Sequence, residues 1–303
     1  MNSATVLQEW SRARAALCAS LTPKAVGIII GRHRALAGIR WRGNLIVTAA
    51  EALGGSEEAV VVAAEGEHQA VVIACDLATD VAVLRVGADA TASSTTASSP
   101  TLEVGAGVVF AGRSRRGPLV SFGTVRLTGP AWSSRRGGAI DQRLEFEGNL
   151  DARFEGALVA DFAGGTQAML VTGPRRTLLG IPASTVERVV AIVERHGYLP
   201  RPYLGVRLQS LWLDDTTRRR WGRAGRLVAA VAGIEPGSPA EAAGVVPGDL
   251  LESIDGAALD DIEAVAMRIA RSVPGQSLEL RVRRGGEPLD LKVEMAEWRA
   301  RHA

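Results

Sequence analysis

The sequence predicts a mainly β protein with two β-rich domains, and three observations support this fold class. The chain has 303 residues, and at roughly 150 residues per domain this length is enough for two domains. From Ala25 to about Val171, short runs rich in β-branched residues alternate with glycine and polar turns, the pattern of a β-sandwich or barrel. A second β-rich stretch, at about 203–295, contains one strongly helical segment.

Three helices are expected around these strands. Residues 4–20 carry apolar side chains at helical spacing. A second helix is expected over 182–197, where Ser184 can cap the first turn and Glu187, three residues later, completes a capping box. A third is expected over 260–272, because its acidic start suits the positive end of a helix dipole.

The remaining segments are expected to be loops and linkers. Residues 88–100 are polar and of low complexity, with too little apolar content to pack in a core. Residues 198–202 contain two prolines and predict a stiff, extended linker. The chain therefore divides into an N-terminal helical segment, a first domain, a second domain and a frayed tail: 1–24, 25–200, 201–296 and 297–303.

Composition excludes several function classes. The net charge of +2 is too small for a dedicated nucleic-acid-binding protein. The two cysteines, Cys18 and Cys75, are too few to form a disulfide framework. They either form one disulfide or remain as two buried thiols. The four histidines form no cluster with metal-ligand spacing, so we expect no metal site and no cofactor.

The sequence also suggests where the protein resides. Its early apolar stretch, Ala25–Gly31, is far shorter than the roughly 20 residues that a spanning helix needs, so no membrane span is expected. Ala15–Leu21 is a poor signal peptide, because it is short and follows charged residues. These features favour a cytoplasmic protein.

Several pieces of the second domain match one known fold in the right order. They are the YLGV motif (203–206), the tract GSPAEAAGVVPGDLLESIDG (237–256) and the closing GQSLELRVRRGG (275–286). This region resembles a PDZ domain of the bacterial protease-associated kind. The resemblance implies capture of a peptide C-terminus, whose carboxylate meets backbone N–H groups in a glycine-containing loop. The implied peptide-binding residues are Tyr203, Leu204, Gly205, Val206 and Ile269.

Residues 25–200 show a second ordered series of motifs. They are NLIVTAAEAL (44–53), DLATDVAVLRV (76–86), LEVGAGVVFAG (102–112), LDARFEGALVAD (150–161) and LLGIPASTVERVVAIVERHG (178–197). The region resembles the trypsin-like domain of the HtrA/Deg family of serine proteases. The whole chain is thus expected to be a trypsin-like double β-barrel followed by a PDZ domain, a β-sandwich-like fold with a helix.

The residues at the family's catalytic positions differ from those the chemistry needs. The resemblance places Glu51 at the histidine position, Asp80 at the aspartate position and Phe154 at the serine position. The glycines around the serine are replaced by Ala152, at the oxyanion-hole position, and Glu155. Loss of one nucleophile or base costs about six orders of magnitude in turnover in subtilisin, and here both are absent. Phe154 is expected to plug the hollow left by the catalytic groups.

These observations predict a non-catalytic HtrA-like pseudoprotease, a scaffold or regulator in protein quality control, that binds peptide or protein C-termini through its PDZ domain. One alternative is an enzyme, either a serine endopeptidase with a rearranged site or a hydrolase that uses the carboxylates of Glu51 and Asp80. We expect instead that this pair is solvated or neutralised by an arginine such as Arg153.

A second alternative is a structural subunit in mixed oligomers with active HtrA-like proteases. The resemblance implies oligomers, commonly trimers formed through N-terminal segments, and Trp10 and Leu17 are candidate contacts if they do not pack on their own barrel. The resemblance also implies that the protein is exported, which is an alternative to the cytoplasmic location predicted above.

Three arginine runs are left over by these assignments, and they lie at 113–116, 135–136 and 218–220. Such runs are usually solvated loops, but they can also dock an acidic partner.

Overall fold

The computed structural model shows two compact units, which we call the barrel unit and the C-terminal unit. The barrel unit runs to Ser134 and resumes from Ala139 to Leu199, and the C-terminal unit takes Arg135–Gly138 and the chain from Pro200 onward. The structure describes residues 3–31, 34–87, 102–200, 202–223, 225–259, 261–270 and 272–297.

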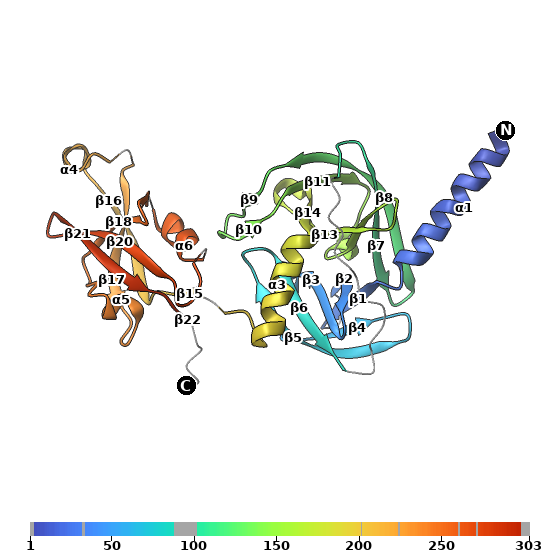
Figure 1. Ribbon diagram of the computed structural model, residues 1–303, viewed down its shortest axis with the longest axis horizontal. Helices are drawn as coiled ribbons and strands as arrows, with labels where there is room; N and C mark the ends of the chain where they lie inside the picture. Colours follow the sequence, from blue (N-terminus) through green and yellow to red (C-terminus); the bar gives the residue numbers. More distant parts are fainter. Residues whose placement is uncertain are drawn as a thin grey trace. The chain divides into compact units, whose positions relative to one another are not determined.

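The barrel unit begins with a closed six-stranded barrel (Figure 1). Its strands are β1 (Ala25–Ile30), β2 (Arg34–Arg42), β3 (Leu45–Ala49), β4 (Glu58–Val62), β5 (Glu67–Asp76) and β6 (Val81–Val86). Their spatial order is β1–β2–β3–β6–β5–β4, and pairing of β1 with β4 closes the ring. Closure leaves no free sheet edge, and the apolar β3 is buried along its whole length.

A second closed barrel follows in the same unit. Its strands are β7 (Gly107–Ser114), β8 (Gly117–Gly129), β11 (Arg143–Gly148), β12 (Leu158–Asp161), β13 (Thr166–Thr172) and β14 (Leu178–Pro182). They are ordered β11–β14–β13–β12–β7–β8, and β8 pairs back with β11. Short elements connect them: the paired strands β9 (Trp132–Ser133) and β10 (Ala139–Ile140), and the 3-10 helices η2 (Ala152–Phe154) and η3 (Pro174–Arg176).

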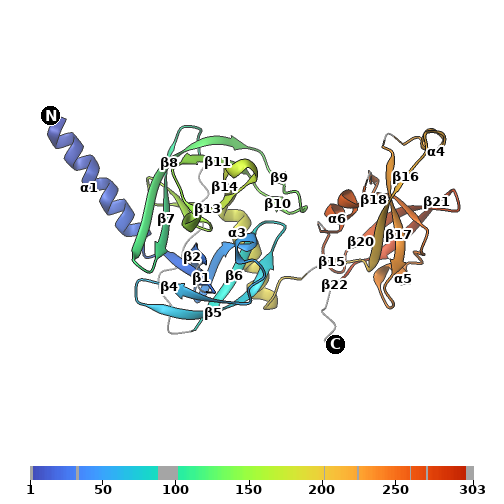
Figure 2. The ribbon, with the colours of Figure 1, turned by 180° about the vertical axis from the view of Figure 1, so that it is seen from behind.

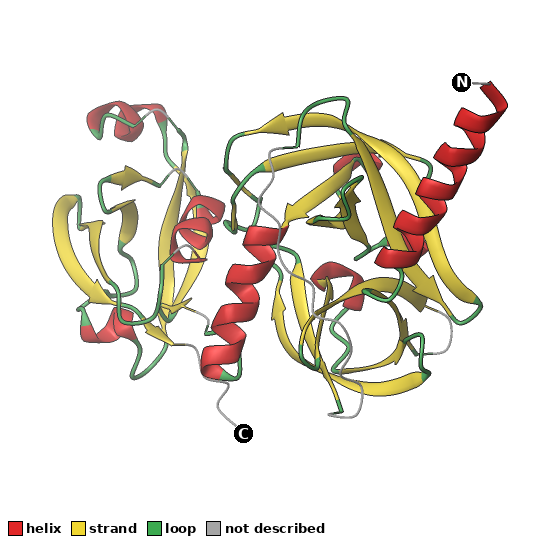
Figure 3. Cartoon of the chain, turned by 45° about the vertical axis from the view of Figure 1, so that its right-hand side comes forward, coloured by secondary structure: helices red, strands yellow, loops and turns green. Residues whose placement is uncertain are grey.

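Helix α3 (Ala183–His196) joins the two barrels, because it contacts β5 and β6 of the first and β13 and β14 of the second (Figure 3). The predicted capping box is wrong. Strand β14 leads directly into the helix, Pro182 is the N-cap residue, and no side chain caps the first turn. The carboxylate of Glu187 instead accepts a hydrogen bond from the indole Nε1 of Trp41 over 2.8 Å.

Helix α1 (Ser3–Leu21) packs on the barrel unit through its C-terminal half. Leu21 is fully buried and Leu17 packs against the same core, whereas Trp10 is 54% exposed. The guanidinium of Arg14 lies 3.6 Å from the ring centroid of Phe122 and 4.4 Å from that of Trp10. Leu17 is therefore a contact within the chain, and Trp10 lies beside a stacked arginine.

The C-terminal unit has a sheet of order β16–β17–β18–β20–β21, with β19 added to β18. Helix α6 packs against β16, β17 and β18 (Figure 2). The strands are β15 (Pro202–Tyr203), β16 (Val206–Trp212), β17 (Leu227–Ile234), β18 (Leu250–Ile254), β19 (Ala257–Ala258), β20 (Ser277–Arg284), β21 (Glu287–Glu294) and β22 (Ala296–Glu297). The helices are α4 (Asp215–Arg220), α5 (Pro239–Ala242) and α6 (Ile262–Ala270). Two barrels followed by this unit confirm the predicted fold class.

Two expectations fall outside the described residues: the polar segment 88–100 and the tail beyond Glu297. Pro202, at the end of the expected linker, already belongs to a strand, because β15 pairs with β22. Cys18 and Cys75 are both free thiols. None of the described helices has the length and apolar content needed to cross a bilayer.

Candidate functional site

Glu51 and Asp80, at the predicted histidine and aspartate positions, meet at one end of the first barrel. Glu51 lies in the short helix α2 (Ala50–Leu53), directly after β3, and its backbone N–H donates to Oδ1 of Asp80 over 2.8 Å. Asp80 ends the turn between β5 and β6 with a φ of 59°. Aspartate and asparagine tolerate this left-handed conformation better than most residues do.

Phe154, at the predicted serine position, lies in the core of the second barrel. Its side chain is only 7% exposed and belongs to the buried cluster that contains Phe110, Phe146 and Leu170. The ring is therefore packed among apolar side chains of the second barrel. The physical reason is that an aromatic ring is more stable against apolar barrel side chains than beside carboxylates.

Three amide donors of the turn that carries Phe154 are bonded inside the turn. The N–H of Phe154 donates to the carbonyl oxygen of Asp151 over 3.0 Å, and that of Glu155 donates to the carbonyl oxygen of Ala152. The N–H of Arg153 donates to the Asp151 side chain. An oxyanion hole needs N–H groups that converge on an external oxygen, and the Phe154 N–H, which the resemblance would pair with that of Ala152, is already bonded to Asp151. Arg153 also forms an ion pair with Asp151 at 2.5 Å, which corrects the expectation that it neutralises the Glu51–Asp80 pair.

Glu155 is a third carboxylate at this site, and sequence reasoning noted it only as a lost glycine. Its side chain accepts hydrogen bonds from the N–H and hydroxyl of Thr172. The next residue, Gly156, has a φ of 83°, and a Cβ there would lie 2.4 Å from the carbonyl oxygen of Ala37. This close approach explains why a glycine is needed at position 156. The substitution of a glycine by an acid, two residues from Arg153, was the signal that could have identified Glu155.

Burial raises the pKa of Asp80 to about 7, and the negative charges of Glu51 and Glu155 act in the same direction. The hydrogen bond from the Glu51 N–H lowers the pKa but does not offset the burial. In a serine-protease triad, the aspartate must be ionised to orient the imidazole and stabilise its charged form. Near neutral pH, Asp80 is protonated in a large fraction of molecules, which suits that role poorly.

We expect Asp80→Asn to remove a pH dependence of stability. Between pH 4 and pH 7 the folded Asp80 holds its proton while the unfolded one has lost it, so the stability of the native chain falls as the pH rises. The Asp80→Asn chain should therefore become more stable than the native chain as the pH rises from 5 to 8, as measured by denaturant unfolding at each pH. A Glu51→Gln chain should show a weaker pH dependence than the native chain, because one repelling charge is gone. If the difference in stability between the Asp80→Asn chain and the native chain stays constant from pH 5 to pH 8, the raised pKa of Asp80 is contradicted.

No replacement nucleophile–base pair is found among the described residues. The hydroxyls of Ser114, Ser121 and Ser134 each donate to a backbone carbonyl oxygen. The imidazole Nε2 of His68 lies 3.6 Å from a Glu65 carboxylate oxygen. Over the part of the chain that the structure describes, no group of three or more His, Cys, Asp or Glu side chains is arranged to hold a metal ion.

The predicted peptide-binding loop lies at the start of β16. The carbonyl oxygen of Leu204 accepts from the N–H of Ala240, and that of Gly205 accepts from the N–H of Glu235. Because the N–H of a trans peptide unit points opposite to its C=O, the N–H groups of Gly205 and Val206 face away from these partners. This orientation is the one that carboxylate binding requires.

The side chains around this loop have different environments. Leu204 is buried in the core of the C-terminal unit, so it stabilises the loop from behind. Tyr203 is half-buried and donates its hydroxyl to Glu235 over 2.5 Å. Val206 and Ile269 pack against the core but remain partly exposed, so each can also contact a ligand.

Comparison with known families identifies both units. Residues 30–166 match the model of the trypsin-like peptidase domain, and residues 231–284 match that of the PDZ domain. A probable periplasmic serine endoprotease DegP-like from Halomonas elongata is 27% identical over 273 residues, which are 84% of this chain and 54% of that protein. The putative serine protease HhoB of Synechocystis is 31% identical over 121 residues, 37% of this chain and 29% of that protein.

Solved structures have the same fold along nearly the whole chain. The HtrA-type protease AlgW with a decapeptide superposes with a TM-score of 0.66 at 19% identity and covers 95% of this chain and 99% of its own. A serine endoprotease from Yersinia pestis gives a TM-score of 0.65 at 17% identity, over 93% of this chain and 98% of its own. The chain spans about half or less of the length of the two curated relatives above. It therefore combines a trypsin-like domain with a PDZ domain, in the arrangement of the HtrA/DegP-type serine proteases to which it is similar.

Proposed function

We propose that this chain is a non-catalytic HtrA-like protein whose PDZ domain, over 201–296, binds the C-termini of peptides or proteins. The observation that carries the proposal is the turn at the serine position. The Phe154 side chain is buried in the barrel core, and its N–H is bonded to Asp151. Acyl transfer by this fold needs an attacking oxygen, a base and free oxyanion donors. Without them, the barrel unit is a scaffold that presents the PDZ domain.

The N–H groups of Gly205 and Val206, which face away from Ala240 and Glu235, support the binding half of the proposal. A C-terminal carboxylate accepts hydrogen bonds from such a loop while the peptide adds a strand to the sheet. This activity suits a protein that recruits clients or regulates an active relative, alone or in a mixed oligomer with it. The name of the Halomonas relative describes a periplasmic protein, which favours an exported location over the cytoplasmic one.

A serine endopeptidase is the second candidate, because the relatives are named as serine proteases and Asp80 occupies the aspartate position. A fluorophosphonate probe reacts with an activated serine and separates the two candidates. We expect no covalent labelling of the purified chain and no cleavage of casein. Inhibitor-sensitive cleavage that disappears in the Asp80→Asn chain would replace the proposed function with the second one.

Binding of C-termini is tested with matched peptide libraries. We expect a peptide with a free C-terminal carboxylate and an apolar last residue to bind at least about tenfold more tightly than the same peptide with a C-terminal amide, since the amide loses charge-assisted hydrogen bonds. Fluorescence polarisation measures both affinities. Equal affinities, or no binding by any member of the library, would contradict the proposal while leaving the fold assignment intact.

A further inference from the structure

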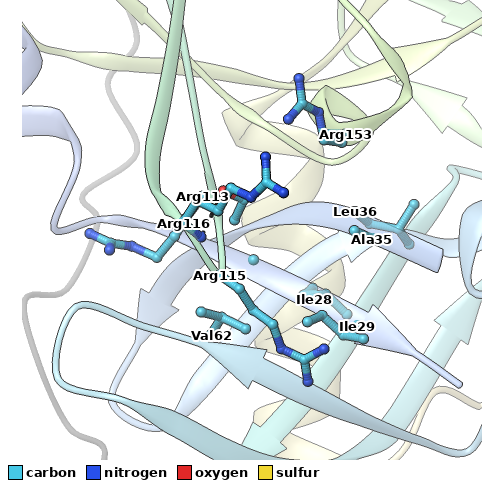
Figure 4. A pocket seen from close by; sticks show the side chains of 11 residues that line it. Ile28, Ile29, Ala35, Leu36, Val62, Arg113, Arg115, Arg116 and Arg153 are labelled. Carbon is cyan, nitrogen blue, oxygen red and sulfur yellow. Dashed lines mark hydrogen bonds between the residues drawn. The ribbon is translucent and has the colours of Figure 1, made fainter. Parts of the chain in front are cut away.

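A pocket of about 220 Å³ lies in the barrel unit, between the first barrel and the tip of the hairpin formed by β7 and β8 (Figure 4). Its apolar wall is formed by side chains of β1, β2 and β4, among them Ile29, Leu36 and Val62. Four arginines also line it: Arg113, Arg115, Arg116 and Arg153. Three of them form the first arginine run of the sequence, and the fourth precedes the serine position.

The hairpin tip approaches β1 closely, and a glycine makes this approach possible. A Cβ on Gly27 would lie 2.6 Å from the carbonyl oxygen of Arg113. The Arg113 side chain also reaches β1, where its Nε donates to the carbonyl oxygen of Ala25 over 3.4 Å. The packing therefore holds the arginine run at the mouth of the pocket and does not leave it as a free, solvated loop.

Among the described residues, carboxylates balance only part of the positive charge at the pocket. Arg115 pairs with Glu67 at 2.7 Å, and Arg153 pairs with Asp151. Both ion pairs are exposed, and exposed pairs exchange partners at little cost. The Arg116 guanidinium is exposed and has no carboxylate partner among the described residues. Within the described part of the chain, four guanidinium groups against two carboxylates leave two positive charges available for a ligand.

We propose that this pocket binds an acidic peptide segment in which one apolar side chain is flanked by carboxylates. The apolar wall and the volume suit one aliphatic side chain, and the arginines suit planar carboxylates, which guanidinium groups bind in a forked geometry. In an extended peptide, side chains two positions apart lie on one face at roughly 7 Å. An apolar residue with acids two positions before and after it therefore presents one apolar and two anionic groups together. This site is separate from the PDZ loop, since it takes internal carboxylates and no chain end.

The test uses fluorescence polarisation with a fluorescein-labelled peptide of sequence Gly-Glu-Ser-Leu-Ser-Glu-Gly, amidated at its C-terminus so that the PDZ loop gains no carboxylate. We expect saturable binding that weakens with added salt. Arg116→Gln should weaken binding about five- to tenfold, because one charge-assisted contact is lost. Glutamine in place of both glutamates of the peptide, or serine in place of its leucine, should each weaken binding at least as much.

A matched control is Arg126→Gln, an exposed arginine on β8 away from the pocket lining, which should leave the affinity unchanged. Circular dichroism verifies that both variants fold. Absence of binding overturns the proposal, as does equal weakening by the two variants. Displacement of the peptide by a lower concentration of single-stranded oligonucleotide would assign the arginines to nucleic acid and overturn it too. These outcomes are independent of PDZ binding, because the peptide has no free C-terminus.

Discussion

Replacing Phe154 by alanine should destabilise the barrel unit by about 3–5 kcal/mol and leave the absence of casein cleavage unchanged. The ring is 7% exposed and packs among Phe110, Phe146 and Leu170, so its loss leaves a cavity as well as removing apolar contacts. Denaturant unfolding measures the loss, and fluorescence of the fully buried Trp41 reports on the same unit.

The matched control is Phe162→Ala. Phe162 is a phenylalanine of the same unit with 51% exposure, so the same chemical change should cost about 1 kcal/mol or less. A loss below about 1 kcal/mol in Phe154→Ala would show that the ring is not a core residue.

Phe154→Ser, alone or together with Glu51→His, should be destabilised to a similar extent without gaining proteolysis. The reason is that a hydroxyl at this position would still lack one oxyanion donor, because the N–H of residue 154 is bonded to Asp151 within the turn. Casein cleavage by the doubly substituted chain would contradict this view and would point to a turn that rearranges.

Replacing Gly205 by valine should abolish binding of C-terminal peptides and destabilise the C-terminal unit. Gly205 has a φ of 79°, and a Cβ there would lie 2.2 Å from Cβ of Ser238. The left-handed backbone costs about 1–2 kcal/mol for a residue with a side chain, and the crowding costs about 1–3 kcal/mol more. The loop must shift away from α5. This shift moves the N–H groups of the loop out of hydrogen-bonding distance of a bound carboxylate.

Gly275→Val separates these two contributions. Gly275 has a φ of 84° in the same unit, and a Cβ there would meet no atom within 4 Å. Gly275→Val should therefore be destabilised only by the strained backbone, by about 1–2 kcal/mol, and should keep its affinity for C-terminal peptides. Thermal unfolding measures the loss of stability in each variant. Fluorescence polarisation measures the peptide affinity, at a temperature where both variants are folded. Equal destabilisation, or intact binding in Gly205→Val, would rule out a carboxylate-binding role for this loop.

The order of the elements was predictable because each signal is local. β-branched runs between glycine turns indicated the strands of both barrels, and the acidic start of the segment 260–272 indicated α6. Ordered motifs also located Glu51 and Asp80, because strand ends determine where the following turns lie. The capping box failed for a nonlocal reason, since Glu187 is hydrogen-bonded to Trp41 from a strand 146 residues away.

The sequence by itself determined which chemical groups stand at Glu51, Asp80 and Phe154, the three positions that the resemblance to serine proteases predicts to be catalytic. Only the tertiary structure decided where those groups point. The side chain of Phe154 turns into the barrel core, three carboxylates share one site, and a hairpin brings an arginine run over apolar strands. These outcomes depend on competition between distant partners for burial and charge, and local sequence patterns carry no information about that competition.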